Sequence, residues 1–216
     1  VNTTAAIGAK PHLSGQTSRR DFLKISGVMG GGLVLAATVP GWAEMDPKLV
    51  GGGELNAYVQ IKPDGSIVIY SGSPEMGQGI ATSLPMIVAE EMGADWGDVI
   101  VEQTPEVNTE RYGRQSTGGS FTVYLNWQLM REMGATAREM LISAAAIVME
   151  LPRDELKAED SRIRHLFSNR SRSFAELASL AQDQPMPAKS ELVFRAREDY
   201  RIIGTSKSQV DSFDIV

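Results

Sequence analysis

The feature that most constrains the fold is an uninterrupted helical pattern from Ser120 to Met149. Its apolar residues recur mostly at intervals of three or four, the period of one face of an α-helix. Ser120 is the predicted N-cap, because a serine side chain accepts a hydrogen bond from a free N–H group of the first turn. Other elements must cover the apolar side of so long a helix. The positions that define this side are Leu125, Leu129, Met133, Ala137, Met140, Leu141 and Ala144.

Short strands and a second helix precede this segment. Two runs, Ala57–Ile61 and Ser66–Tyr70, alternate apolar and polar residues around Pro63-Asp64-Gly65. This arrangement predicts a β-hairpin, because proline and glycine favour tight turns between alternating strands. A helix is predicted over Ala81–Gly93, with its final glycine as the C-cap, and a further strand over Val99–Glu102.

The segment after the long helix repeats this mixture on a smaller scale. Strands are predicted at Glu155–Glu159 and Arg162–His165, followed by a short helix around Phe174–Ala181. Hairpins and helices interleave without the regular strand–helix–strand repeat of a doubly wound sheet. The predicted fold class is therefore α+β, with hairpins and strands packed against one long helix.

Composition excludes several kinds of site. The chain of 216 residues has a net charge of −6, which gives no overall basic field to attract nucleic acid. It contains no cysteine, so it cannot form a disulfide, a thiolate zinc site or an iron–sulfur cluster on its own. Its two histidines are His12 and His165. His165 is interpreted as a half-exposed histidine at a strand end, not as part of a Ser–His–Asp triad.

The N-terminal region has the pattern of an export signal. Ser18–Lys24 (SRRDFLK) matches the twin-arginine signal at each defined position. A moderately apolar run, Ile25–Val39, follows, and Pro40–Ala43 places small residues where a signal peptidase cleaves. The run is too short and too rich in glycine for a membrane anchor. Cleavage and a periplasmic location are therefore predicted, with Gly51–Gly53 as part of a linker.

Two loops rich in small residues are the candidate ligand-binding elements. The first contains Gly77-Gln78-Gly79, and the second, Ser116–Ser120 (STGGS), directly precedes the long helix. Glycine lets a ligand approach the backbone closely, and a helix N-terminus attracts phosphate. The Gln78 amide offers a donor and an acceptor to the edge of a heterocycle. Taken alone, each loop also fits a plain turn or cap, and neither matches a Walker or Rossmann fingerprint.

Together with their neighbours, these loops resemble a specific family. Glu75–Gly79 (EMGQG), Ala89–Gly93 (AEEMG) and Ser116–Ser120 look like the molybdopterin-binding large subunit of the xanthine oxidase family. The twin-arginine start and Gly134–Leu141 (GATAREML) are similar to the isoquinoline 1-oxidoreductase beta subunit and related periplasmic aldehyde dehydrogenases. The likeness covers nearly all of residues 54–216.

The resemblance implies a cofactor and the residues that contact it. In that family, the glycine–glutamine–glycine loop contacts the pterin, and the second loop lies against the molybdenum and its dithiolene. The implied cofactor is molybdenum–molybdopterin in its dinucleotide form. The family's catalytic glutamate lies far downstream, so no catalytic residue or direct metal ligand is expected in this chain. The implied cofactor-binding residues are Gly77, Gln78, Gly79, Thr117, Gly118, Gly119 and Ser120.

Three carboxylates near these motifs need a separate interpretation. Glu75, Glu90 and Glu91 lie in or beside the quoted motifs, but none of them corresponds to the family's catalytic glutamate. Charged residues in loops and helices usually face solvent. All three are therefore interpreted as surface charges.

The resemblance also implies partners and an incomplete chain. The expected partners are the remainder of the large subunit, a small subunit that carries iron–sulfur clusters, and a cytochrome c that accepts electrons. The implied reaction is oxidation or hydroxylation of an aldehyde or an N-heterocycle, with oxygen supplied by water. Because family members are several times longer, the chain is expected to be a fragment, a truncated reading frame or one piece of a split subunit. The alternative is an exported, cofactor-free interaction domain or an inactive remnant.

The expected organisation follows from these assignments. Residues 1–43 are interpreted as the signal segment and 44–53 as a linker. Residues 54–203 are expected to form the N-terminal part of a molybdopterin-binding domain. Residues 204–216 are expected to begin the connection to a missing domain.

Overall fold

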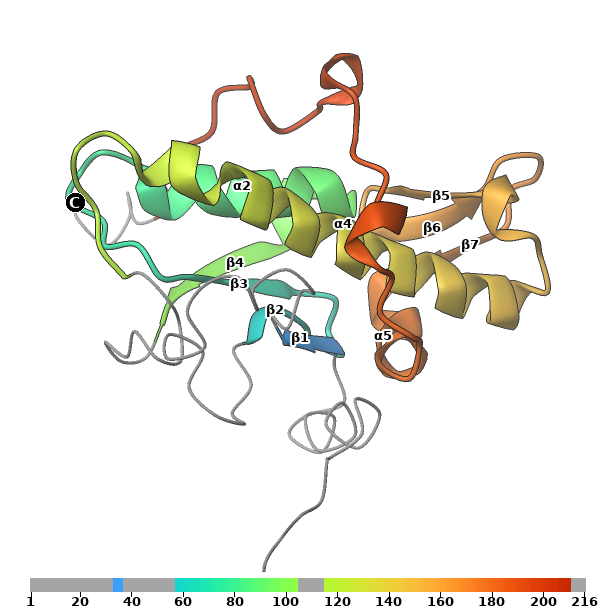
Figure 1. The fold of residues 1–216 in the computed structure, drawn as a ribbon. Helices are drawn as coiled ribbons and strands as arrows, with labels where there is room; N and C mark the ends of the chain where they lie inside the picture. Colours follow the sequence, from blue (N-terminus) through green and yellow to red (C-terminus); the bar gives the residue numbers. More distant parts are fainter. Residues whose placement is uncertain (1–32, 37–56, 105–114, 211–216) are drawn as a thin grey trace, which may run out of the picture.

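The computed structural model describes residues 33–36, 57–104 and 115–210 (Figure 1). Three α-helices and two small β-sheets lie within these residues, which confirms the predicted α+β class. In Figure 1, α2 and α4 lie side by side along the first sheet, and the second sheet lies beside the far end of α4. Of the predicted signal segment, only residues 33–36 are among those described. The twin-arginine motif and the linker at 44–53 lie outside them.

The first sheet has the strand order β1–β2–β3–β4. β1 (Leu33–Ala36) pairs antiparallel with β2 (Ala57–Ile61), and β2 pairs antiparallel with β3 (Ile67–Ser71). In the second pair, Val59 lies opposite Ile69. Both of these side chains are buried, so one face of the hairpin belongs to the core.

The turn of this hairpin confirms its predicted chemistry. The Lys62 N–H donates to the Ser66 carbonyl oxygen at 2.8 Å, and Gly65 adopts a φ of 96°, which glycine tolerates without strain. The Asp64 carboxylate accepts hydrogen bonds from the Ser66 N–H and hydroxyl. These hydrogen bonds hold the turn between β2 and β3.

A crossover helix connects the third and fourth strands. α2 (Ile80–Met92) leads from β3 to β4 (Val99–Gln103), and these two strands are parallel, with Ile67 opposite Val99. A parallel pair needs such a crossover connection. Gly93 ends α2 in a left-handed conformation, φ 79°, as predicted for a C-cap glycine. The sequence pattern did not predict the parallel pairing.

The long helix is present, but its predicted N-cap is wrong. α4 spans Thr122–Met149, and Phe121 occupies the N-cap position. Ser120 has a φ of 58° and follows Gly119, which is also left-handed with a φ of 63°. An N-cap side chain reaches the first turn from an extended backbone conformation. Two consecutive left-handed residues therefore delay the start of the helix and separate Ser120 from it.

The second sheet is a small antiparallel meander with a helix after it. Its strands are β5 (Leu156–Glu159), β6 (Arg162–His165) and β7 (Ser171–Ser173), in that order. α5 (Phe174–Gln182) starts with a capping box, in which Ser173 and Glu176 bond each other's backbone N–H groups. Short 3₁₀ turns occur at Trp96–Asp98, Arg153–Glu155, Lys189–Glu191 and Arg197–Asp199.

The tightest contact between α2 and α4 occurs at Gly134. A methyl group built on this glycine lies 2.4 Å from the Val88 carbonyl oxygen and 2.8 Å from the Glu91 Cβ. Both distances are far below normal contact distance, so only glycine fits at this point. The segment whose sequence resembles the family therefore contains the point where the two main helices meet.

Glu90 and Glu91, interpreted above as surface charges, are buried. Their residues are 2% and 1% exposed, respectively. Glu90 Oε2 accepts hydrogen bonds from the backbone N–H groups of Arg201, Ile202 and Ile203, at 2.9, 2.7 and 2.9 Å. These bonds satisfy a carboxylate that is costly to bury unpaired. Glu90 thereby attaches the C-terminal segment, residues 193–210, to the end of α2.

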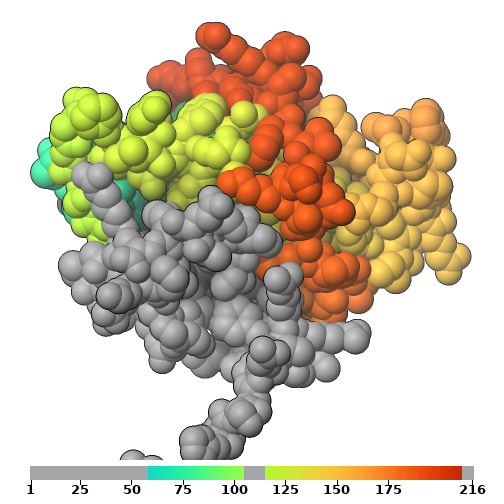
Figure 2. All heavy atoms as spheres, in the orientation of Figure 1, coloured from blue at the N-terminus to red at the C-terminus, as the bar shows by residue number. Residues whose placement is uncertain are grey.

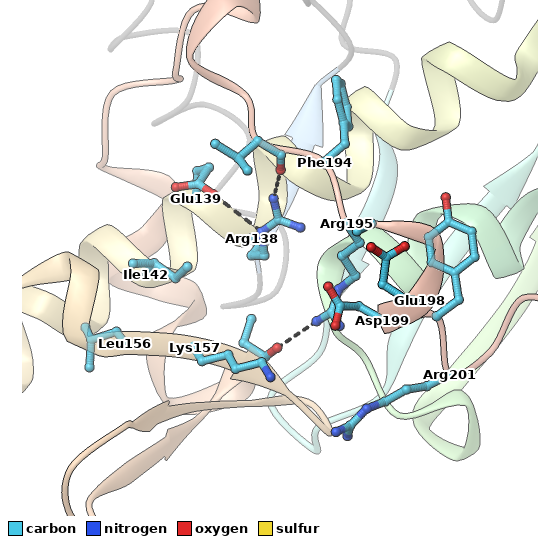
Figure 3. Close-up of a pocket in the computed structure, with 14 residues that line it drawn as sticks. Arg138, Glu139, Ile142, Leu156, Lys157, Phe194, Arg195, Glu198, Asp199 and Arg201 are labelled. Carbon is cyan, nitrogen blue, oxygen red and sulfur yellow. Dashed lines mark hydrogen bonds and ion pairs between the residues drawn. The ribbon is translucent and has the colours of Figure 1, made fainter.

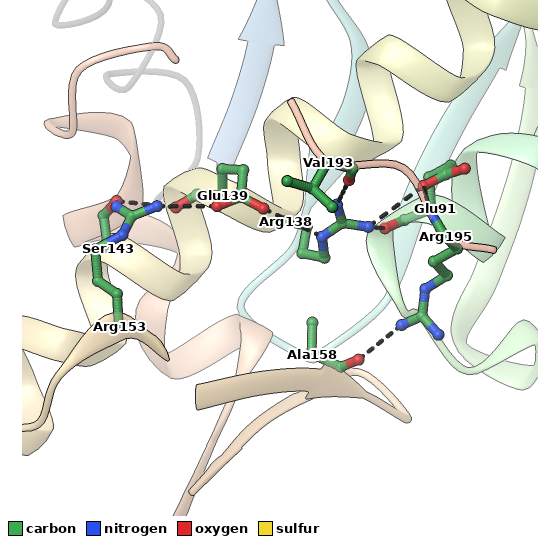
Figure 4. Close-up of polar contacts among 8 residues, drawn as sticks. All are labelled: Glu91, Arg138, Glu139, Ser143, Arg153, Ala158, Val193 and Arg195. Carbon is green, nitrogen blue, oxygen red and sulfur yellow. Dashed lines mark hydrogen bonds and ion pairs between the residues drawn. The ribbon is translucent and has the colours of Figure 1, made fainter. Parts of the chain in front are cut away.

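Glu91 forms a second attachment for the same segment (Figure 4). Its carboxylate pairs with Arg131 Nε at 2.6 Å and Arg138 at 3.3 Å, and it accepts a hydrogen bond from the Arg195 N–H at 2.9 Å. Arg138 also donates to the Val193 carbonyl oxygen. In Figure 2, the orange-red residues of this segment lie next to the yellow-green residues of α4. Two adjacent glutamates of α2 therefore anchor the C-terminal segment.

The start of α4 presents exposed apolar side chains. Phe121, Val123, Tyr124 and Leu125 are all exposed, although Leu125 is on the predicted apolar side. From Met130 onward that side is covered by α2, the second sheet and α5. None of the helices in the described part of the chain is long and apolar enough to span a membrane.

Candidate cofactor site

The structure brings the two candidate loops together. The first leaves β3 and the second comes after β4, and the carboxyl ends of these parallel neighbours lie at one edge of the sheet. Thr117 Oγ1 donates a hydrogen bond to the Pro74 carbonyl oxygen at 2.8 Å. Loops at this edge of parallel strands commonly bind ligands. The predicted residues Gly77–Gly79 and Thr117–Ser120 therefore belong to one region of the molecule.

Glu75 organises the first loop and is not a free surface charge. Its Oε1 accepts hydrogen bonds from the N–H groups of Met76, Gly77 and Gly79, at 3.1, 2.7 and 2.9 Å. Its Oε2 accepts one from the Ala81 N–H at 2.9 Å. The N-terminal end of α2, where a phosphate is often bound, is thus occupied by the protein's own carboxylate.

These hydrogen bonds change the acidity of Glu75. Partial burial alone raises the pKa of the carboxyl. The N–H groups of Ala81, Gly79, Gly77 and Met76 act in the opposite direction, and the net result is a pKa below the ordinary value of 4.5. The Glu75 carboxylate of the folded loop is therefore ionised at neutral pH.

We expect the loop to respond to acid through this carboxylate. Because the folded-state pKa is lowered, the stabilisation is complete above the ordinary glutamate pKa and is lost as pH falls through the lowered value. The ¹H and ¹⁵N shifts of Gly77, Gly79 and Ala81 should follow one titration with a midpoint below 4.5. In the Glu75→Gln variant that titration should disappear. Its persistence there would assign it to another group.

The Gln78 side chain is folded onto its own loop. Its Oε1 accepts a hydrogen bond from the Met76 N–H at 2.6 Å, and its Nε2 donates to the Pro74 carbonyl oxygen at 3.1 Å. Pro74 thus accepts from both Gln78 and Thr117. The amide donor and acceptor that were predicted to face a heterocycle are both directed to backbone groups. Because these bonds are exposed, water can replace them at small cost.

Two glycines leave open space beside the loops. Among the described residues, no atom outside the adjacent residues lies within 4 Å of a methyl group built on Gly77 or on Gly118. Gly119 is closer to its surroundings, because such a methyl lies 3.1 Å from the Phe121 ring. A planar ligand can therefore approach the backbone at Gly77 and Gly118. These positions fit a pterin, although Glu75 and Gln78 already bond several N–H groups of the first loop.

The C-terminal segment returns to this region. The Val210 N–H donates to Thr82 Oγ1 at 3.1 Å, in the first turn of α2. A methyl group built on Gly79 lies 3.5 Å from Gln209 Nε2. Residues predicted to begin an interdomain connection thus lie beside the first candidate loop.

A separate cavity lies between α4, β5 and the C-terminal segment (Figure 3). Its volume is about 540 Å³, and none of the seven predicted cofactor residues lines it. Its walls carry both basic and acidic side chains, including Arg138, Arg195, Glu198 and Asp199. Burial lowers the pKa of Arg195, whose guanidinium donates to the Ala158 carbonyl oxygen at 2.7 Å. The mixed charge of this cavity does not favour a polyanionic cofactor.

His165 lies at the end of β6, as predicted. Its Nε2 is 2.9 Å from Glu155 Oε2, and its Nδ1 is 2.7 Å from Ser168 Oγ. The order Ser–His–Glu resembles that of a hydrolase triad, but these residues do not line the 540 Å³ cavity. The contacts connect the β6–β7 turn to the residue before β5, which is a structural role.

Comparison with known proteins identifies the family. A family model described as a molybdopterin cofactor-binding domain matches residues 17–211. The beta chain of isoquinoline 1-oxidoreductase from Brevundimonas diminuta is 32% identical over 173 residues, 76% of this chain and 22% of that protein. A component of nicotinate dehydrogenase from Pseudomonas putida is 34% identical over 162 residues, 73% and 13% of the two chains. The crystal structure of quinoline 2-oxidoreductase from Pseudomonas putida 86 aligns with 56% of this chain and 15% of that one, at 23% identity and a TM-score of 0.47.

The match and the sequence relatives first define a class, that of proteins similar to subunits of oxidoreductases. Within this class, the chain belongs to the molybdopterin cofactor-binding domain family. The family resemblance of the sequence motifs is therefore confirmed. The chain spans only 22% and 13% of the length of the two curated relatives.

Proposed function

We propose that this chain contributes part of the molybdopterin site of a molybdenum hydroxylase large subunit. The observation that carries the proposal is the hydrogen bond from Thr117 to Pro74, because it joins two loops that are 43 residues apart in sequence. Gly77, Gln78 and Gly79 would contact the pterin from the first loop. Thr117, Gly118, Gly119 and Ser120 would contact the molybdenum side from the second. Once bound, the cofactor would supply the redox chemistry.

The details of the assembly belong to the same proposal. Both sequence relatives are named as single subunits of their enzymes, which supports an enzyme of several chains. Because this chain has no cysteine, we assign the iron–sulfur clusters to a small subunit. We further propose the dinucleotide form of the cofactor, a cytochrome c as electron acceptor, and an aldehyde or N-heterocycle as substrate. The remainder of the large subunit would supply the catalytic glutamate.

Metal and pterin analysis tests the proposed cofactor site. The protein should be purified from cells that synthesise molybdopterin and co-express its partner subunits. We expect the wild-type assembly to contain molybdenum and pterin at near-stoichiometric levels. The combined Gly77→Val and Gly118→Val substitution should abolish both. Their absence from the wild-type assembly would favour a cofactor-free interaction domain. Two observations support this interaction domain as a second candidate. Several N–H groups of the first loop are bonded within the loop itself, and the start of α4 exposes apolar side chains.

Gln78→Ala should weaken cofactor retention without unfolding the chain. The lost ligand hydrogen bond is worth about 0.5–1.5 kcal/mol, which corresponds to a few-fold to roughly tenfold lower affinity. Gly79→Val should damage both binding and folding, because Gly79 has a φ of 81° and a β-branched residue is strained there. Melting temperature and molybdenum content are to be measured for both variants. An equal loss of cofactor-free stability in both would make the Gln78 amide structural.

We also propose export by the twin-arginine route to the periplasm. The support is the SRRDFLK motif and the weakly apolar run that follows it. Arg19→Lys combined with Arg20→Lys should retain the protein in the cytoplasm, because this pathway reads the arginine pair. Cell fractionation and immunoblotting provide the measurement. An unchanged periplasmic yield would argue for a general secretory signal.

A further inference from the structure

We propose that Glu75 is the positioning residue of the cofactor loop and acts on the ligand through Gln78. This role rests on the proposed cofactor site. Four backbone N–H groups converge on one carboxylate, and two of them, those of Gly77 and Gly79, flank Gln78 on both sides. The carboxylate thus determines where the Gln78 Cα lies, while the Gln78 side chain itself makes only exposed contacts.

The distribution of hydrogen bonds separates a fixed part of the loop from a movable part. The fixed part is the backbone from Met76 to Ala81, which Glu75 holds with both of its oxygens. The movable part is the Gln78 amide, which is bonded to Met76 and Pro74. When this amide turns toward a ligand, the Met76 N–H keeps its bond to Glu75 and the Pro74 carbonyl oxygen keeps its bond from Thr117. The backbone of the loop therefore remains in place when the Gln78 amide gives up its bonds to Met76 and Pro74.

The neighbouring glycines explain why the loop needs hydrogen bonds to a fixed side chain. Gly77 and Gly79 have φ values of 92° and 81°, and a methyl group built on Gly77 meets no atom within 4 Å in the part of the chain that the structure describes. Glycine loses more backbone entropy on ordering than any other residue. Packing does not order Gly77, so the order must come from hydrogen bonds. Glu75 provides them from within the loop, independently of the protein core.

The core offers a matched control for this role. Glu90 also collects consecutive backbone N–H groups, but it is buried and attaches the C-terminal segment at Arg201–Ile203. Glu75→Gln and Glu90→Gln remove the same charge from two similar arrangements. If Glu75 positions the loop only, Glu75→Gln should leave the melting temperature within about 2 °C of the wild type, whereas Glu90→Gln lowers it.

Amide exchange on the 216-residue chain is the first test. Glu75→Gln should accelerate exchange at Gly77, Gly79 and Ala81 by a few-fold, because a carboxamide retains one acceptor oxygen. Glu75→Ala should accelerate it by roughly tenfold or more. Glu90→Gln should leave the ratio of loop exchange to global exchange unchanged. Unaltered exchange in Glu75→Ala would overturn the positioning role.

Molybdenum content of the assembled protein is the second test. Glu75→Ala should lower it by about as much as Gln78→Ala, and the double variant should lose no more than either single one, because both act through the same contact. Additive losses, or full retention in Glu75→Ala, would overturn the proposed action through Gln78. If the wild-type assembly carries no molybdenum, the proposed function fails, and the exchange measurements alone decide whether Glu75 positions the loop.

Discussion

Replacing Gly134 with alanine is expected to lower the stability of the fold by about 1–3 kcal/mol, the usual cost of overpacking a core. The added methyl group would lie 2.4 Å from the Val88 carbonyl oxygen and 3.2 Å from the Met92 N–H nitrogen. Both are backbone atoms of α2, so no side chain can move aside, and the two helices must separate. Alanine favours a helix over glycine by about 1 kcal/mol, and this gain offsets only part of the clash.

Thermal and urea unfolding of the 216-residue chain provide the measurement. For a chain of this size, each 1 kcal/mol lowers the melting temperature by about 2–4 °C. Gly118→Ala is the matched control, because a methyl group built there has no neighbour within 4 Å among residues 33–36, 57–104 and 115–210. Equal stability of Gly134→Ala and Gly118→Ala would show that α2 and α4 do not meet at Gly134.

Removing the Glu91 carboxylate is expected to have a still larger effect. Glu91→Ala leaves Arg131 and Arg138 without their buried partner, and their side chains are only 17% and 10% exposed. Breaking a buried ion pair on one side typically costs about 3–5 kcal/mol. The substitution also removes the acceptor for the Arg195 N–H. We therefore expect rapid amide exchange at Arg195 as well as a lower unfolding midpoint.

A neighbouring glutamate provides the comparison. Glu139 is 3.4 Å from Arg138, but Arg138 keeps its bonds to Glu91 and Val193 when Glu139 is removed. The closer partner of Glu139 is Arg153, at 2.9 Å, and the Arg153 side chain is 50% exposed (Figure 4). Exposed pairs of this kind contribute about 1 kcal/mol or less. Glu139→Ala should therefore be mild, and Glu91→Gln should lie between Glu139→Ala and Glu91→Ala. Equal losses for Glu91→Ala and Glu139→Ala would rule out a buried anchoring role for Glu91.

Local features of the fold were predictable from the sequence, and long-range ones were not. The β2–β3 hairpin and the Gly93 C-cap follow from turn and cap residues within a few positions of each other. The parallel pairing of β3 with β4 depends on how α2 packs, which residue periodicity does not reveal. Glu90 was misinterpreted for the same reason, because its partners Arg201–Ile203 are more than 100 residues away.

The candidate site shows the same division. Glycine content and the family resemblance selected both loops, and the structure places them side by side through Thr117 and Pro74. The role of Glu75 was missed, although its position two residues before Gly77 is a usable signal, since a carboxylate in a glycine-rich turn often bonds nearby N–H groups. Ser120 was misassigned as N-cap because its left-handed φ, shared with Gly119, is set by the loop and not by residue preference.

The attachment of the C-terminal segment by Glu90 and Glu91 has a consequence for biosynthesis. The ribosome makes α2 first, yet the backbone groups that Glu90 binds are 111–113 residues further along, and the Arg195 N–H bound by Glu91 is 104 residues further along. At synthesis rates of about 5–20 residues per second, this separation corresponds to a delay of roughly 5–20 s. During that interval Glu90 lacks its backbone partners, whereas Glu91 can already pair with Arg131 and Arg138, which are 40 and 47 residues further along. The hydrogen bonds that Glu90 accepts from Arg201–Ile203 therefore form only when the segment through Ile203 has left the ribosome.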